Sequence, residues 1–224
     1  LIFVSGDRTA FFYINLSAIF VILLSQKLFK LRLIILIASV LLIVIISFIN
    51  PTAKQRVIDY TLNQMIVEKE TKKKHEKEGK YIFSMQHTHH YLTAYRMFLD
   101  NKILGVGVKN FRNLCNDEKD RESRFSCSSH PHNSYLQVLT EIGIIVFLFL
   151  MGILIIFFRF ICKHLLFNMR GKFYFSDFEI CILSAIAIYL WPFAPTGNVF
   201  SNWLNIAMIL NLPFLIWSRK SETI

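Results

Sequence analysis

Residues 130–158, HPHNSYLQVLTEIGIIVFLFLMGILIIFF, decide the fold, because a polar start leads into a long apolar run from residue 135 to 158. This run approaches the roughly 17–25 residues that a helix needs to span the hydrocarbon of a bilayer. The two histidines and the asparagine then stand at the water–lipid boundary, where an imidazole can exchange a proton near neutral pH. The stretch predicts a membrane helix with ionisable groups at its mouth.

Four further apolar runs lie on either side of this stretch, at 9–25, 32–49, 177–193 and 199–217. Hydrophobic residues make up 54% of the 224 residues, and the mean hydropathy is +0.46, too apolar for a soluble domain of this size. We therefore predict an all-α integral membrane protein, a polytopic helix bundle with about five transmembrane helices. The apolar start at Leu1 suits the C-terminal part of a longer protein.

Basic residues divide the connections between these runs into two groups. The connections 26–32 and 159–176 and the tail with Arg219 and Lys220 are rich in Lys and Arg, and five crossings put all three on one side. The positive-inside rule makes that side cytoplasmic. The loop 194–198 and the long polar segment then face outward together.

The chain accordingly divides into three parts. Residues 1–49 are predicted to form two transmembrane helices, the second stopped by Asn50-Pro51. Residues 50–134 form a large extracytoplasmic loop with short helices, in which the charge run 68–80 is explained by a solvated segment. Residues 135–224 form three transmembrane helices and a cytoplasmic tail.

The net charge of +10 is explained by these connections rather than by a nucleic-acid partner. No basic groove with interleaved aromatic residues accompanies the charge, so nucleic acid is excluded as a partner. The lipid bilayer is the partner that the charge pattern favours.

Polar residues on the predicted outer face are candidates for chemistry. Glu141 lies in an apolar run, where an unpaired carboxylate is expensive, so it should face the bundle interior with a partner. Arg8 opens the first run on the same face. Asn198 and Asn202, one helical turn apart, are expected to point at a polar cavity.

Five histidines invite comparison with a metal site, but their spacing matches no usual zinc pattern, and we predict no metal. The first three are also explained as interfacial or hydrogen-bonding residues, and the last as a helix-start residue satisfied by backbone. The five are His87, His89, His90, His130 and His132.

The four cysteines fall on both predicted sides. Cys115 and Cys127 lie in the outer segment, in an oxidising compartment, and we predict a disulfide that closes a short loop before His130. Such a loop is worth about 3 kcal/mol in the chain-entropy model. Cys162 and Cys181 lie near cytoplasmic membrane ends and are assigned packing roles.

Three motifs occur in a recognisable order and spacing. His132-Asn133 is followed after nine residues by Gly143, Ser5-Gly6-Asp7-Arg8 opens the first run, and residues 103–111 read ILGVGVKNF. Together they resemble the O-antigen ligase and O-antigen polymerase superfamily of polytopic bacterial glycosyltransferases, over nearly the whole chain. In that family the motifs are His followed by Asn, Ser or Gln, nine residues and Gly; Ser-x-x-Arg; and Pro-Leu-x-Gly-x-Gly-x-x-x-Phe.

Three positions depart from the family pattern. Val146 replaces a small or hydroxylated residue, and Lys102 stands where proline is frequent. The family's arginine in the outer segment has Arg96 and Arg112 as its nearest counterparts, with His87 as a replacement.

The resemblance implies a metal-independent, inverting glycosyltransferase without a cofactor, in the bacterial inner membrane with its active site facing the periplasm. The donor would be a glycan on undecaprenyl diphosphate, and the acceptor hydroxyl would belong to lipid A-core, another glycan or a protein. His132 would be the catalytic base. The diphosphate would be bound by Arg8, Arg96 and Arg112, and the site would be supported by His130, Asn133, Glu141 and Asn198.

Several functions remain open at this point. Ligation to lipopolysaccharide core is the main expectation, with repeat-unit polymerisation and transfer to protein as alternatives, because acceptor choice would be set by loops and by helices outside this sequence. A non-enzymatic transporter of lipid-linked glycan is more distant. Transporters usually show paired broken helices in related halves, and no such repeat is present.

Overall fold

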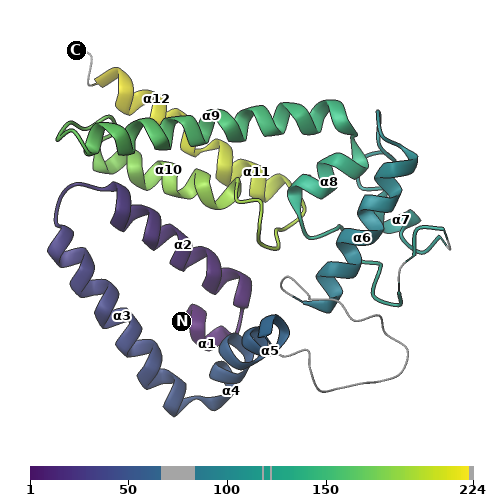
Figure 1. The fold of residues 1–224 in the computed structure, drawn as a ribbon, viewed down its shortest axis with the longest axis horizontal. Helices are drawn as coiled ribbons and strands as arrows, with labels where there is room; N and C mark the ends of the chain where they lie inside the picture. Colours follow the sequence, from purple (N-terminus) through teal and green to yellow (C-terminus); the bar gives the residue numbers. More distant parts are fainter. Residues whose placement is uncertain (67–83, 118, 122, 222–224) are drawn as a thin grey trace.

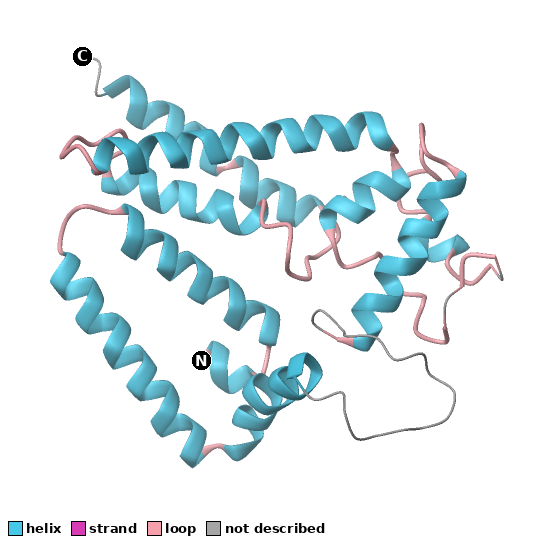
Figure 2. Ribbon diagram, viewed as in Figure 1, coloured by secondary structure: helices cyan, strands magenta, loops and turns pink. Residues whose placement is uncertain are grey.

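The computed structural model describes residues 1–66, 84–117, 119–121 and 123–221. Within these ranges every regular element is helical and no strand occurs, as Figure 2 shows, which confirms the predicted all-α fold. The charge run 68–80 lies outside the described residues.

The N-terminal helices are α1 (Ile2–Ser5), α2 (Arg8–Leu24) and α3 (Phe29–Ile49). Asp7 starts α2, because its carboxylate accepts the backbone N–H groups of Thr9 and Ala10, each at 3.0 Å. The helix α3 ends at Ile49, just before Asn50-Pro51, as the sequence predicts. In Figure 1, α2 and α3 form a hairpin that opens toward the short helices after it.

The described parts of residues 50–134 contain short helices: α4 (Pro51–Lys54), the π-helical turn η1 (Gln55–Asp59), α5 (Tyr60–Ile66), α6 (Met85–Asp100) and α7 (Phe111–Leu114). The buried face of α6 includes Ala94 and Met97, which pack against Phe111 and Cys115. This small core supports α6 and α7, whereas Ala53 of α4 and Val57 of η1 pack in a different core with Phe3 of α1.

The apolar run that begins at residue 135 is broken into two helices, α8 (Ser134–Glu141) and α9 (Ile144–Asn168), where a single span was expected. Gly143 separates them with φ +92°, a backbone angle that residues with a side chain rarely adopt. The membrane helix therefore begins nine residues later than the sequence pattern predicts, and α8 is free to turn toward α6 (Figure 1).

The last two runs also differ from the expected spans. They form α10 (Asp177–Tyr189), α11 (Asn202–Ile209) and α12 (Asn211–Ser221). The 13 residues of α10 rise about 20 Å, less than the hydrocarbon thickness of about 30 Å. The last run is interrupted at Leu210, between α11 and α12. Pro213 follows in the first turn of α12, where its missing N–H is tolerated.

Two described helices, α3 and α9, are long and apolar enough to cross a membrane, and α2 is a shorter apolar helix. Five transmembrane helices are therefore more than length and composition establish. The main apolar core lies between α2, α9 and α10 and includes Leu24, Phe157, Ile161, Ile180 and Leu183. In contrast, α3 has no buried residue, so its apolar side chains are free to face lipid.

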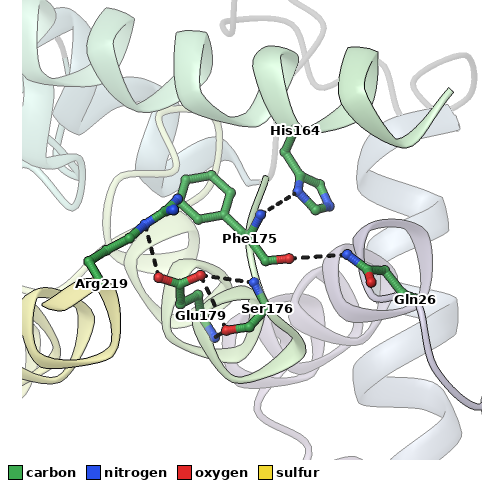
Figure 3. Close-up of polar contacts among 6 residues, drawn as sticks. All are labelled: Gln26, His164, Phe175, Ser176, Glu179 and Arg219. Atoms are coloured by element: carbon green, nitrogen blue, oxygen red, sulfur yellow. Dashed lines mark hydrogen bonds and ion pairs between the residues drawn. The ribbon is translucent and has the colours of Figure 1, made fainter. Parts of the chain in front are cut away.

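A group of hydrogen-bonded and ion-paired residues, which we call the polar node, connects the basic connections at the start of α10. It consists of Gln26, His164, Phe175, Ser176, Glu179 and Arg219 (Figure 3). Glu179 is fully buried, accepts the backbone N–H of Ser176 at 2.8 Å and pairs with Arg219 of α12 at 2.9 Å. Because one partner comes from the C-terminal tail, this capping carboxylate also holds α12 against α10.

A histidine on α9 completes this node. His164 accepts the Phe175 N–H at Nδ1, at 3.2 Å, and donates from Nε2 to the Leu24 carbonyl, at 2.9 Å. Gln26 donates to the Phe175 carbonyl at 3.2 Å. The connection after α2, the end of α9 and the tail thus meet at one end of the bundle.

Candidate functional site

Four imidazole rings gather where α6 meets the loop before α8. The ring centre of His132 lies 4.1 Å from that of His130 and 5.3 Å from those of both His87 and His90. We call these four residues the histidine cluster. His89, which lies between His87 and His90 on α6, instead stacks on Phe125, with the two ring centres 6.5 Å apart.

The backbone around His132 is held in an unusual conformation. His132 has φ +58°, in the left-handed region that costs residues with a side chain about 1–2 kcal/mol. Its carbonyl accepts the Thr196 N–H at 2.8 Å, and Asn133 caps α8 by accepting the N–H groups of Tyr135 and Leu136 at 3.0 Å. The left-handed turn is fixed from both sides and aims the ring into the cluster.

The two loop histidines differ in what their nitrogens do. His130 is buried, donates from Nε2 to the Thr196 carbonyl at 3.2 Å and meets Ser129 Oγ at Nδ1 at 2.9 Å. For His132, the described residues provide no hydrogen bond to either ring nitrogen. His130 is therefore engaged in structure, whereas His132 has nitrogens available to a substrate.

Burial and crowding keep the cluster neutral. Burial lowers the pKa of His87 and of His132 to about 4, and the neighbouring imidazoles add to the effect. Burial also lowers the pKa of His90 and of His130. Near pH 7 His132 is thus unprotonated and able to accept a proton. Within the described ranges, no three His, Cys, Asp or Glu side chains are placed to hold a metal ion.

Arg8 lies beside this cluster, at the first turn of α2. It lines a cavity of about 340 Å³ together with His87 and residues of α2, η1, α5 and the 194–195 loop. The positive charge of Arg8 contributes to lowering the pKa of His87. Arg8 brings a permanent positive charge to a lining that is otherwise uncharged or apolar, while the Asp7 carboxylate already accepts the N–H groups at this end of α2.

The other two predicted diphosphate-binding residues lie elsewhere. Arg96 is exposed on α6, where its charge acts on the carboxyl of Asp120. Arg112 is exposed on α7 and donates from Nε to the Lys109 carbonyl at 3.2 Å. Neither lines the cavity of Arg8, so the structure brings Arg8 together with His87 instead.

Glu141 has several partners, although it ends a helix in an apolar run. Its side chain is 1% exposed and accepts the backbone N–H groups of Lys109, at 2.9 Å, and Phe111, at 3.0 Å. Gln137, one turn earlier on α8, donates to it at 3.2 Å. The carboxylate is therefore satisfied by the loop 105–111 rather than by the membrane bundle.

Gln137 is a site residue that the sequence reasoning missed. It is fully buried, donates to Asn198 Oδ1 at 2.9 Å and accepts the Val199 N–H at 3.0 Å. Its side chain therefore connects Glu141 to the loop before α11. The sequence does carry a signal, because residues four apart on a helix share a face and Gln137 stands four before Glu141.

The loop 192–199 is fastened to the start of α8. Asn133 donates to the Pro192 carbonyl at 2.9 Å, and Ser134 donates to Thr196 Oγ1 at 2.9 Å. These bonds hold the segment in loop form, so α11 begins only at Asn202. The expectation that Asn198 and Asn202 share a helical turn was wrong, and Asn202 is exposed.

The structure joins Cys115 and Cys127 by a disulfide, with their Cα atoms 5.2 Å apart. Cys115 is buried in the small core of α6 and α7, and the bridge anchors the loop that leads to His130. Cys162 and Cys181 are both exposed, so the packing role assigned to them was wrong. They lie on outward faces of α9 and α10, away from the core between these helices.

Comparison with known proteins identifies the family of this chain. The family model described as O-antigen ligase matches residues 1–151, a range that contains Arg8, the loop 103–111 and the segment from His132 to Gly143. No curated protein and no solved structure matched the chain. The family and the apolar helices together indicate a membrane protein. The chain belongs to the O-antigen ligase family, whose members are O-antigen ligase-like or polymerase-like membrane glycosyltransferases.

Proposed function

We propose that this protein transfers a glycan from undecaprenyl diphosphate to an acceptor hydroxyl, with lipid A-core as the acceptor. One observation carries the proposal: His87 lines the cavity of Arg8 and also lies 5.3 Å from His132. His87 thereby links Arg8 to the imidazole of His132, which supports a shared site for donor and acceptor. A diphosphate-linked donor needs both groups, the arginine for its leaving group and the imidazole for the attacking hydroxyl.

His132 serves as the general base in this proposal. The acceptor oxygen attacks the anomeric carbon as the bond from that carbon to the phosphate oxygen breaks, and the hydroxyl proton passes to His132. Polyprenyl diphosphate departs with the bonding electrons. Attack opposite the leaving group inverts the anomeric centre, and a positioned base contributes roughly 10²–10⁴-fold to such a step.

Arg8 stabilises the departing diphosphate. Guanidinium stays ionised and offers paired donors that match phosphate oxygens, so it stabilises developing charge without a metal ion. We therefore expect transfer to persist in the presence of EDTA. Strong inhibition by EDTA that magnesium or manganese reverses would contradict this part of the proposal.

We further propose five crossings, formed by α2, α3, α9, α10, and α11 with α12, in the inner membrane. Two features support this arrangement. The basic connections meet at the node of Glu179 and Arg219, and the histidine cluster is built from segments that join the opposite ends of the same helices. With the node in the cytoplasm, the cluster faces the periplasm.

The test is a transfer assay with the full-length protein, a polyprenyl-diphosphate-linked glycan and purified lipid A-core. We expect glycosylated core and free polyprenyl diphosphate from wild type. Arg8→Lys should lose most activity, because a point charge does not reproduce the paired donors. Longer lipid-linked glycan without glycosylated core would identify a polymerase instead, and absence of any transfer from a bound donor would overturn the proposal.

A further inference from the structure

The cavity of Arg8 contains two side chains that can carry a positive charge. Among the described residues that line it, Arg8 and His87 are the titratable ones. A diphosphate diester carries two negative charges, one on each phosphate. Arg8 balances one of these charges. Among the described lining residues, His87 is the one that can balance the other.

The orientation of His87 suits it to this role. Ser84 caps α6 by accepting the backbone N–H of His87 at 3.2 Å, and its Oγ lies 2.7 Å from His87 Nδ1. The serine therefore fixes the ring through one nitrogen and leaves Nε2 as the nitrogen for a ligand. An imidazolium fits this arrangement well, because Nδ1–H donates to Ser84 Oγ while Nε2–H donates to a phosphate oxygen.

We propose that His87 takes up a proton when the diphosphate binds and acts, as an imidazolium beside Arg8, as the second cation of the diphosphate site. The inference rests on the proposed function, because it presumes a diphosphate in this cavity. It makes His87 a diphosphate-binding residue, distinct from the base His132, and it makes donor binding a proton-coupled step.

The charges around His87 explain why the proton arrives with the ligand. The groups that face His87 are Arg8 from α2, His90 and Tyr91 from α6, and His130 and His132 from the loop before α8. Burial, together with the cationic forms of His90, Arg8 and His130, opposes protonation and lowers the pKa of His87 to about 4. Two phosphate charges act in the opposite direction and raise that pKa in the complex.

Proton linkage gives the sign of the effect. Between the pKa of His87 in the free protein and its higher value in the complex, the complex binds one more proton. Affinity for the diphosphate therefore rises as pH falls through this window, by up to about tenfold per pH unit. A site built from arginine alone would bind with the same affinity throughout.

The experiment is calorimetric titration of the full-length protein in nanodiscs with farnesyl methyl diphosphate, from pH 5 to 8. This probe is a diphosphodiester, so its own charge stays constant in the range and it needs no particular sugar. Titration in two buffers of different ionisation enthalpy counts the protons taken up. We expect uptake approaching one proton, and affinity that falls as pH rises.

Three variants locate the proton. His87→Arg should bind with affinity independent of pH, and His87→Gln should bind on the order of tenfold more weakly at pH 6 and take up no proton. His89→Gln, on the same helix but stacked on Phe125, should match wild type. Binding without proton uptake, or uptake that survives in His87→Gln, would overturn the inference and leave the proposed function standing. Failure of wild type to bind the probe at any pH would overturn the proposed function itself.

Discussion

A Cβ atom on Gly143 would lie 2.0 Å from the carbonyl oxygen of Ile103. The backbone at residue 143 can therefore approach that of Ile103 this closely only because a glycine stands there. The reverse also holds, because a Cβ on Gly105 would lie 2.5 Å from the carbonyl carbon of Glu141. Backbone bonds join the two segments, from Gly107 N–H to Glu141 and from Ile144 N–H to Lys102, both 2.9 Å. The glycine loop and the histidine motif thus form one interlocked unit.

Gly143→Ala should therefore destabilise the protein. The added methyl group clashes with backbone, which cannot swing away, and a positive φ adds about 1–2 kcal/mol of strain. We expect a clearly lower thermal unfolding midpoint in detergent. Gly152→Ala is the matched control, because a Cβ at Gly152 in α9 meets nothing within 4 Å, and it should leave the midpoint unchanged or slightly higher. Equal effects of the two changes would contradict the interlock.

Glu141→Gln should weaken the same unit through its hydrogen bonds. The carboxylate accepts two backbone N–H groups, whereas an amide offers one oxygen and turns a donor toward the second N–H. The buried group left unsatisfied costs about 1–3 kcal/mol. Asp100→Asn is a control carboxylate, since its pair with Lys119 is exposed and screened by solvent and should contribute little to stability. Chemical unfolding measures the free energy of unfolding of both variants. This free energy should fall clearly more in Glu141→Gln than in Asp100→Asn.

Several residues of this site can be predicted from the sequence, because an ionisable side chain in an apolar run rarely serves packing alone. A carboxylate in an apolar run needs partners, and Glu141 has them, but the pattern could not show that those partners are backbone groups of a distant loop. Periodicity likewise finds the apolar run after residue 135, yet it does not see that Gly143 bends the chain. Contacts between segments decide both features, and hydropathy does not encode such contacts.

The histidine cluster shows the same limit. His87 and His90 lie one turn apart on α6, which a helical pattern reveals, but their approach to His132 depends on the left-handed backbone of that residue. Arg96 was a candidate because of its charge and position along the chain. Its place on α6 directs it away from the cavity, whereas His87 reaches it.

His132→Ala should abolish glycan transfer with membrane abundance near normal, because it removes the available imidazole without breaking a hydrogen bond of its ring. His130→Ala should reduce transfer less, and it should lower stability, since it removes bonds to Ser129 and Thr196. Transfer assays on membranes, normalised to protein abundance, measure both. Wild-type transfer by His132→Ala would remove this residue from the mechanism.

Acid should destabilise the protein through the histidine cluster. In the folded protein burial lowers the pKa of His87 and of His132 from the ordinary value of 6.5 to about 4. Between pH 6.5 and 4 the unfolded chain therefore binds more protons, and stability falls as pH falls. The thermal midpoint should drop across this window, and it should drop less in the double variant His87→Gln with His132→Gln. An identical pH dependence in wild type and double variant would contradict the assignment.

The placement of the site outside the cytoplasm can be tested with single cysteines on the two sides of the bundle. The basic connections meet at the node of Glu179 and Arg219, so the positive-inside rule puts the connection with Lys172 in the cytoplasm and the exposed face of α6 outside. In a background of Cys162→Ser and Cys181→Ser, an impermeant maleimide applied to spheroplasts should label Tyr95→Cys at once. Lys172→Cys should react only after the membrane is permeabilised. The reverse pattern would place the histidine cluster in the cytoplasm, where the proposed periplasmic transfer could not occur.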